Sequence, residues 1–334
     1  MLPPASLADC PFRVRFVPEA GARPDERALA LIRFGAGSVF TEDPREARVP
    51  LAVLQGAPLA EHWISENPVQ HGWQDGMGYA HNGEVMFGQL HLDAREFAHP
   101  DHAAFRAYVR MDRLMQQLGY PGWLRMWIYM GGIHDGEGDG ERYRQFCIGR
   151  HRAMSLKPGF EKNLPAATVI GTHAPGLLIY FLAGRTSGIQ VENPRQVSAF
   201  QYPREHAPVG PSFSRATLKH WRDRAQLLVS GTASIVGHES RHIDNVAAQL
   251  VELKTNIRSL IRHAMATHFP GATAQQCRAE GFKLYVRDRA LLQQLQESIA
   301  EYFPTDAPLL ILEGDICRRE LLVEVEGSYA MPEP

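Results

Sequence analysis

Long apolar runs are missing from this sequence of 334 residues, which argues against a membrane-spanning helix. Such a helix needs about 20 consecutive apolar residues, and the longest apolar stretch lies near residues 177–183. A large charge of one sign is missing too. The net charge of −2 gives no electrostatic reason to expect nucleic acid or an anionic membrane as a partner. The apolar content of 44% is typical of a globular protein, and the length allows two domains or one large one.

Cysteine is scarce, and the positions of the cysteines indicate the cellular compartment in which the protein folds. Cys10, Cys147, Cys277 and Cys317 are scattered and form no CxxC pair. Free thiols in a reducing setting are the simplest account of this pattern. The first ten residues contain no basic region followed by an apolar core, so no secretory signal is expected. The sequence therefore predicts a cytoplasmic protein.

The stretch 309–327 contains two apolar runs around a polar turn, which predicts two strands forming a hairpin. Glu324 stands out in the second run because Val323 and Val325 flank it and must face the other way. Two interpretations stay open at this point. The face that carries Glu324 is simply wetted by solvent, or the carboxyl lies over a pocket as a general acid with a raised pKa.

The order of elements in residues 81–187 recurs in residues 225–334. In each part a glycine-containing strand precedes an amphipathic helix, a strand, a second helix and two final strands that we predict to be a hairpin. Gly88 and Gly231 are 143 positions apart, and Leu177 and Leu321 are 144 apart. A constant spacing of this kind predicts a duplicated domain within an α+β fold. Aligning the last strands places Tyr180 opposite Glu324, so only the second unit carries this carboxyl.

Two further segments complete the predicted organisation. Residues 1–80 are rich in proline and glycine and predict an irregular N-terminal extension. Residues 188–224 connect the two units and contain prolines, aromatic residues and planar hydrogen-bonding groups. A flexible linker is normally rich in glycine and serine, so we expect an ordered connection, and ordered loops often carry ligand contacts.

Residues 238–242, HESRH, match the pattern of two histidines and a glutamate that binds zinc in helical metalloproteases. The helical periodicity begins only near Val246, so these residues are expected in a loop at a pocket rim. A zinc-dependent hydrolase that uses His238 and His242, with Glu252 as a third ligand, is retained as an alternative. Our preferred interpretation includes no metal.

Several arginines are candidates for binding carboxylates, because the guanidinium fork binds a carboxylate through two hydrogen bonds. Arg150 follows Gly149 late in a predicted helix, where it could also simply complement the helix dipole. Arg215 lies in the connecting segment, and Arg318 and Arg319 lie in the final turn.

At this point the motifs together resemble a family. Each unit is similar to the YjgF/RidA-like fold, also described as chorismate-mutase-like, and the whole chain resembles a chorismatase. The matching pieces are Tyr143-x-x-Phe146-x-x-Gly149-Arg150, ENPRQVSAFQYP, SGTASIVGHES and GDICRRELLVEVEG, which lie between residues 80 and 327. In one respect the chain departs from the simpler deaminase-like proteins: their carboxylate-binding arginine in the penultimate strand is replaced here near Leu309.

The resemblance implies a cofactor-independent enzyme that cleaves chorismate to pyruvate and 3-hydroxybenzoate, 4-hydroxybenzoate or both. It places the family's catalytic glutamate on Glu324 and its product-determining pair on Gly231 and Cys317. We expect Gly231→Ala to crowd the substrate ring while leaving the acid untouched. A non-catalytic protein of the same fold that binds a small metabolite is the other alternative.

Chemical logic agrees with this expectation. Cleavage of the enol ether requires a proton at the terminal methylene carbon, and carbon is a weak base, so the acid must be protonated and well placed. The two substrate carboxylates require two cationic contacts, for which we choose Arg150 and Arg215, with Tyr143 and Tyr202 as further substrate-binding residues. The duplicated chain is expected to act as a monomer with an internal pseudo-oligomeric interface.

Overall fold

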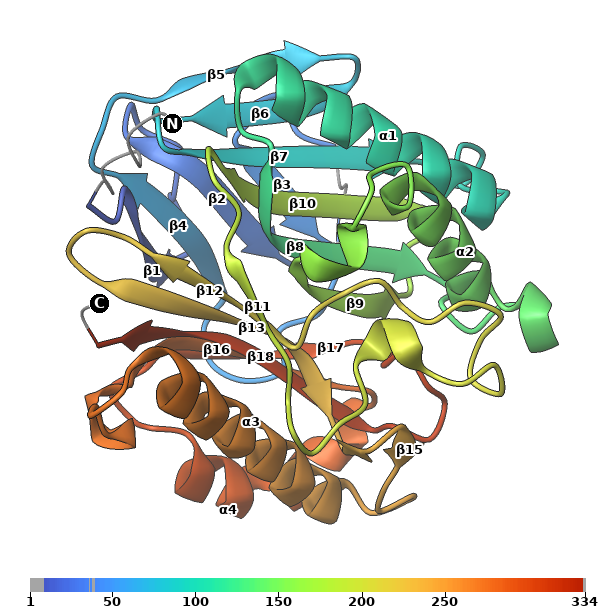
Figure 1. Cartoon of the computed structure of the whole chain (residues 1–334). Helices are drawn as coiled ribbons and strands as arrows, with labels where there is room; N and C mark the ends of the chain where they lie inside the picture. Colours follow the sequence, from blue (N-terminus) through green and yellow to red (C-terminus); the bar gives the residue numbers. More distant parts are fainter. Residues whose placement is uncertain (1–8, 36, 38–39, 333–334) are drawn as a thin grey trace.

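Two six-stranded sheets with equivalent strand orders form the centre of this computed structural model, which describes residues 9–35, 37 and 40–332 (Figure 1). Residues 1–8, on which much of the expectation about a secretory signal depends, lie outside that range. The first sheet has the order β5-β6-β7-β10-β8-β9, and the second has the order β11-β12-β13-β18-β16-β17. The predicted tandem duplication is therefore confirmed.

The strands of the first sheet are β5 (Gln70–Gln74), β6 (Met77–His81), β7 (Val85–Leu92), β8 (Gly122–Gly131), β9 (Ala166–Thr172) and β10 (Leu177–Gly184). Those of the second are β11 (Ile189–Val191), β12 (Ala216–His220), β13 (Ala225–Ala233), β16 (Arg278–Val286), β17 (Leu309–Glu313) and β18 (Val323–Met331). Two very short strands, β14 (Ile235–Val236) and β15 (Glu239–Ser240), pair with each other beyond β13.

In the part of the chain that the structure describes, four α-helices lie on the outer faces of the sheets, two for each unit (Figure 1). They are α1 (Pro100–Leu118), α2 (Arg142–Met154), α3 (Val246–His268) and α4 (Leu292–Tyr302). The helix α1 ends at Gly119, which adopts a left-handed conformation with φ 80° that glycine accommodates without a steric penalty. Among the described residues, no helix has both the length and the apolar character needed to cross a membrane.

The predicted hairpins are wrong, although the strands themselves exist. The strand β10 pairs with β7 and β8 instead of β9, and β18 pairs with β13 and β16 instead of β17. The strands β9 and β17 lie parallel to β8 and β16, because a helix intervenes and carries the chain back in the same direction. Apolar runs identify strands but do not encode which strands are neighbours.

The N-terminal extension is more regular than we expected. The strands β1 (Phe12–Pro18), β2 (Ala28–Phe34), β3 (Glu46–Val49) and β4 (Leu59–Ser65) form a separate sheet in the order β1-β4-β2-β3. The expected boundary at residues 80 and 81 also cuts through β6 and leaves β5 outside the unit whose sheet it joins. In the same way, β11 and β12 lie within the predicted connecting segment.

Three apolar clusters hold these layers together. One lies between α1, α2 and the first sheet, and a second lies between α3, α4 and the second sheet. The third is enclosed by the inner faces of both sheets and the N-terminal sheet. On β10 and β18, alternation sends one set of side chains to the helices and the other set to this shared inner layer. The candidate site lies at the edge of the inner layer.

Candidate active site

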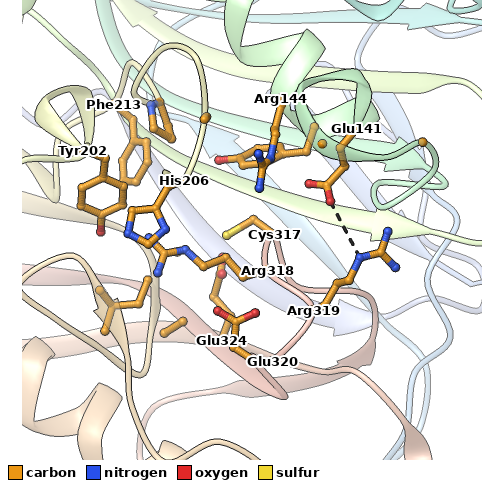
Figure 2. A pocket seen from close by; sticks show the side chains of 18 of the residues that line it. Glu141, Arg144, Tyr202, His206, Phe213, Cys317, Arg318, Arg319, Glu320 and Glu324 are labelled. Atoms are coloured by element: carbon orange, nitrogen blue, oxygen red, sulfur yellow. Dashed lines mark ion pairs between the residues drawn. The ribbon is translucent and has the colours of Figure 1, made fainter. Parts of the chain in front are cut away.

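A cavity of about 640 Å³ opens where the two units meet the connecting segment (Figure 2). Five segments supply its walls: the stretch from the loop after β8 into the start of α2, the connecting segment, β13 with β14, the turn after β17, and β18. The lining residues on which the argument depends are Glu141, Tyr143, Arg144, Tyr202, His206, Phe213, Arg215, Gly231, Cys317, Arg318, Arg319, Glu320 and Glu324. Six of the seven predicted site residues therefore line one cavity.

Glu324 lies on β18 and points away from the helices, as alternation with Val323 and Val325 requires. It is 4% exposed. Among the described residues it has no hydrogen-bond or ion-pair partner. Burial raises the pKa of this carboxyl to about 8, and the negative charge of Glu326 acts in the same direction. Glu324 is therefore mostly protonated at neutral pH and faces an open volume.

Glu326, two residues further along β18, lies in the opposite electrostatic environment. Its carboxylate accepts hydrogen bonds from Trp127 Nε1 at 2.8 Å and from Tyr285 Oη at 3.1 Å, and it lies 2.9 Å from Lys283 Nζ. Arg125 and Thr168 also donate to it. Burial acts against ionisation, but Lys283 and Arg125 outweigh it and hold the pKa of Glu326 below its usual range. Glu326 is therefore an anion beside a neutral acid.

Gly231 occupies an irregularity in the ladder between β13 and β18, where the register shifts between Val229 and Thr232. Bulges of this kind are common beside active sites because they interrupt pairing and redirect the chain. The Gly231 N–H donates to Thr168 Oγ1 at 3.0 Å. A Cβ atom at Gly231 would overlap Oε1 of Glu324. The expectation that Gly231→Ala leaves the acid untouched is therefore wrong.

One wall of the cavity contains two guanidinium groups that both lie against the ring of Tyr202. Arg215 lies 5.4 Å from the Tyr202 ring centroid and donates to Tyr202 Oη at 2.7 Å. Arg318 lies 5.2 Å from the same centroid and donates to the His238 carbonyl oxygen at 2.8 Å. Arg215 Nε and Arg318 Nη2 are buried and have no hydrogen-bond partner among the described residues. This wall therefore has unused cationic donors.

The opposite wall comes from α2 and the loop before it (Figure 2). Tyr143 and Arg144 lie there, and Glu141 is 3.8 Å from Arg319 across the opening. Cys317 lies between the walls in Figure 2. Burial raises the pKa of its thiol to about 12, with the Glu324 charge adding to the effect, so it is a neutral group and a poor nucleophile.

Arg150 is the one predicted site residue that is not among the lining side chains. It lies on α2, is 1% exposed, and packs 5.4 Å from the Tyr108 ring centroid. Its Nε and Nη2 atoms have no hydrogen-bond partner within the described part of the chain. Its assignment as a carboxylate contact stays a prediction.

The two histidines of the HESRH stretch make separate contacts and do not face a common site. His242 has a positive φ and lies outside any helix, where its Nε2 is 3.1 Å from Glu252. His238 instead meets His206 of the connecting segment, with 3.0 Å between the ring nitrogens, and Glu205 lies nearby. In the described ranges, this trio is the one group whose ligand atoms lie close enough to hold a metal ion, and it does not include His242. The geometry of a helical zinc site is therefore not formed.

Sequence reasoning missed Glu326, Arg144, Glu141 and Phe213. Glu326 could have been found, because it shares a strand face with Glu324. Arg144 and Glu141 lie at the start of α2 and Phe213 lies in the connecting segment, and no periodicity in the sequence indicates that these two segments meet at one cavity.

Taken together, the fold and the cavity define an α+β enzyme with a neutral buried carboxyl and a cationic wall. The comparisons with known proteins make this assignment specific. A family model described as "Chorismatase FkbO/Hyg5-like, N-terminal" matches residues 61–183. A 3-hydroxybenzoate synthase from Streptomyces hygroscopicus is 36% identical over 291 residues, which cover 84% of each chain. A chorismatase from Streptomyces rapamycinicus is 33% identical over 99% of this chain and 100% of its own.

A chorismatase crystal structure has a TM-score of 0.86 and 30% identity, covering 97% of this chain and 99% of that chain. This chain belongs to the chorismatase family. The predicted family resemblance and the predicted α+β fold class are thereby confirmed.

Proposed function

We propose that this enzyme cleaves chorismate to pyruvate and a hydroxybenzoate, with Glu324 as the general acid. Chorismate is a dianion whose enolpyruvyl ether breaks after its terminal methylene carbon is protonated. Glu324 supplies that proton, and the resulting oxocarbenium ion releases pyruvate as the C–O bond to the ring breaks. The ring then loses one C–H proton and becomes aromatic, which balances the proton that Glu324 gave. Conversion to pyruvate and hydroxybenzoate consumes no net water and transfers no electrons to another molecule, so the proposal requires no cofactor.

The observation that carries the proposal is the pairing of a protonated carboxyl with unused guanidinium donors in one cavity. Glu324 is neutral near pH 7 because burial and the charge of Glu326 raise its pKa more than Arg125 and Arg215 lower it. Arg215 and Arg318 present buried N–H groups without partners, and a buried donor gains most when an anionic acceptor reaches it. A site that only bound a dianion would gain nothing from a buried neutral acid.

The substrate carboxylates are assigned to the guanidinium wall. Arg215 and Arg318 both lie against Tyr202, so two cations lie close together on one side of the cavity. Tyr143 lies on the opposite wall and can contact the ring of the substrate. Arg150 is buried on α2 and does not line the cavity, so we do not assign it a substrate carboxylate.

The product is proposed to be 3-hydroxybenzoate, alone or together with 4-hydroxybenzoate. Gly231 and Cys317 are both small and line the cavity beside Glu324, so the ring has room to turn after protonation. A hydroxyl of the substrate can then reach the cation before water does. The similarity to a 3-hydroxybenzoate synthase supports this assignment.

We also propose that one chain is a complete catalytic unit in the cytoplasm. Residues of both units and of the connecting segment line the cavity within a single chain, and all four cysteines are free thiols. Sedimentation of the purified protein tests the first point, and a dimer whose dissociation abolished turnover would contradict it.

The decisive experiment is incubation of the purified protein with chorismate. Enzymatic detection of pyruvate measures cleavage, and chromatography against 3-hydroxybenzoate, 4-hydroxybenzoate and dihydrodiol standards identifies the second product. We expect equal amounts of pyruvate and hydroxybenzoate. Unchanged chorismate after prolonged incubation with folded protein would exclude the proposed function.

A further inference from the structure

A buried group of four charged side chains lies directly behind Glu324. It consists of Glu61 on β4, Arg125 on β8, Lys283 on β16 and Glu326 on β18, and we call it the Glu326 cluster. Lys283 Nζ lies 2.8 Å from Glu61 Oε1 and 2.9 Å from Glu326 Oε1, and Arg125 pairs with the other oxygen of Glu326. All four side chains are at most 6% exposed. The N-terminal sheet and both units thus each contribute to one ionic network.

The charges of this cluster balance without Glu324. Two cations and two anions give a net charge of zero, so an ionised Glu324 would add a negative charge that no member of the cluster neutralises. An uncompensated buried charge is costly, and a carboxyl in that position takes up a proton instead. Outside the cluster, the charge of Arg215 acts against protonation of Glu324, and the neutral thiol of Cys317 lies beside it. The side chains of Arg318 and Glu320 line the same cavity.

Glu61 supplies the negative charge that brings the cluster to zero net charge, and it lies outside the cavity. It lies on the N-terminal sheet and does not line the cavity that holds Glu324. Its carboxylate contacts Lys283, whose other anionic partner is Glu326. Without the charge of Glu61, Lys283 and Arg125 would share the single anion Glu326, and the cluster would carry an excess positive charge two residues from Glu324.

We infer that Glu61 is a positioning residue for the reaction, because it completes the charge balance of the Glu326 cluster and thereby keeps Glu324 protonated. This inference rests on the proposed role of Glu324 as the general acid. It assigns a function to the N-terminal sheet: the sheet sets the protonation state of a residue in the second unit. Removing the Glu61 charge should let Glu324 ionise at lower pH, and removing the Lys283 charge should do the opposite.

The test uses Glu61→Gln, Lys283→Gln and the double variant that removes both partners of the ion pair. Glu324 is titrated directly by NMR of protein labelled at the glutamate side-chain carboxyl carbons, with its signal assigned as the one missing in Glu324→Gln. The same proteins are assayed for pyruvate release between about pH 5 and pH 10, because a required acid makes kcat/KM fall above its pKa.

We expect Glu61→Gln to lower the Glu324 titration midpoint by up to about one pH unit, because the effect of a buried charge at an effective dielectric constant of about 20 decreases with its distance. Lys283→Gln should raise the midpoint, and the double variant should return it towards the wild-type position. The alkaline limb of the pyruvate profile should move with it. The matched control is Glu46→Gln, because Glu46 is a buried carboxylate of the same sheet paired with Arg33 outside the cluster.

A merely structural role for Glu61 would lower kcat/KM equally at every pH and leave the midpoint in place, and that result would overturn the inference. A lower Glu324 titration midpoint in Lys283→Gln would also overturn the inference. The inference can therefore still be tested with Lys283→Gln if Glu61→Gln does not fold. If both single variants fail to fold, the cluster is structural and the inference falls. If the midpoints move as expected but wild-type protein releases no pyruvate, the proposed function fails while the electrostatic coupling stands.

Discussion

The strands β10 and β18 occupy the same position in the two sheets, but they present different chemistry to the layer between them. Both lie between two antiparallel neighbours, and both send apolar side chains to their helices. On the inner face, β10 carries Leu178, Tyr180 and Leu182, whereas β18 carries Glu324 and Glu326. Tyr180 stacks on Trp127 with 4.8 Å between the ring centroids.

This difference shows that the two duplicated units contribute different chemical groups to the layer between them. The first unit supplies donors, with Arg125, Trp127 and Thr168 all bonded to Glu326 of the second unit. The second unit supplies the carboxyls. Because Glu326 takes up these donors, its neighbour Glu324 has none and stays neutral. Two glutamates on one strand face thus have opposite protonation states because their environments differ.

The largest expected effect comes from removing the neutral carboxyl of β18, which has no counterpart on β10. We expect Glu324→Gln to fold and to lose turnover by a factor of about 10²–10⁴ or more, because an amide of nearly the same shape has no proton to give to carbon. Pyruvate release by the purified variant measures this. Glu320→Gln is the matched control, since Glu320 also lines the cavity but accepts a hydrogen bond from Ser240 at 2.6 Å. Rapid turnover by folded Glu324→Gln would contradict the assignment of the acid.

The same variant should be more stable than the wild type in alkaline solution. The pKa of Glu324 is raised from 4.5 to about 8 in the folded protein, so the folded state binds more protons than the unfolded chain between these values. The stability that this group provides is fully present below about pH 4.5 and is lost as pH rises towards about 8. Glu324→Gln avoids the loss, which we expect to be on the order of a few kcal/mol. Urea unfolding at several pH values measures the difference, and equal pH dependence in both proteins would argue against a buried neutral carboxyl.

The guanidinium wall provides the next comparison. We expect Arg215→Ala and Arg318→Ala each to raise KM for chorismate about tenfold or more, since a charge-assisted hydrogen bond contributes about 1.5–3 kcal/mol. Steady-state pyruvate assays give KM and kcat separately. Arg319→Ala is the control, because its side chain is 62% exposed and a screened contact contributes less. Arg150→Ala should raise KM less than Arg215→Ala or Arg318→Ala. A larger rise would indicate that a substrate carboxylate binds Arg150 on α2.

Gly231→Ala should give the smallest effect, and it also tests how tightly the acid is held. The new methyl group would overlap Oε1 of Glu324, so the flexible carboxyl must rotate to make room. We expect kcat to fall and the product ratio to move away from 3-hydroxybenzoate, by about 1–3 kcal/mol in transition-state free energy. Chromatography of the products measures both. An unchanged rate and ratio would show that Glu324 does not need its observed position.

These residues also show how far the sequence alone could lead. The alternation around Glu324 predicted that its carboxyl faces away from Val323 and Val325, and the constant spacing of the repeats predicted the two units. Alternation is a local property, and it left open whether the face that carries Glu324 is buried. The partners of β10 and β18 could not be predicted, because strand order depends on how the crossover helices pack. The contacts of Lys283 with Glu61 and Glu326 join three separate parts of the chain, and no spacing in the sequence indicates them.

The placement of β18 also has a consequence for folding. This strand comes after β13, β16 and β17 in the chain, yet it lies between β13 and β16. The two earlier strands therefore cannot complete their sheet until β18 has entered the gap between them. Such pairing between residues distant in sequence is slow to form. The step that completes the second sheet is also the step that delivers Glu324, so intermediates that precede it lack the acid at the cavity and cannot act on substrate prematurely.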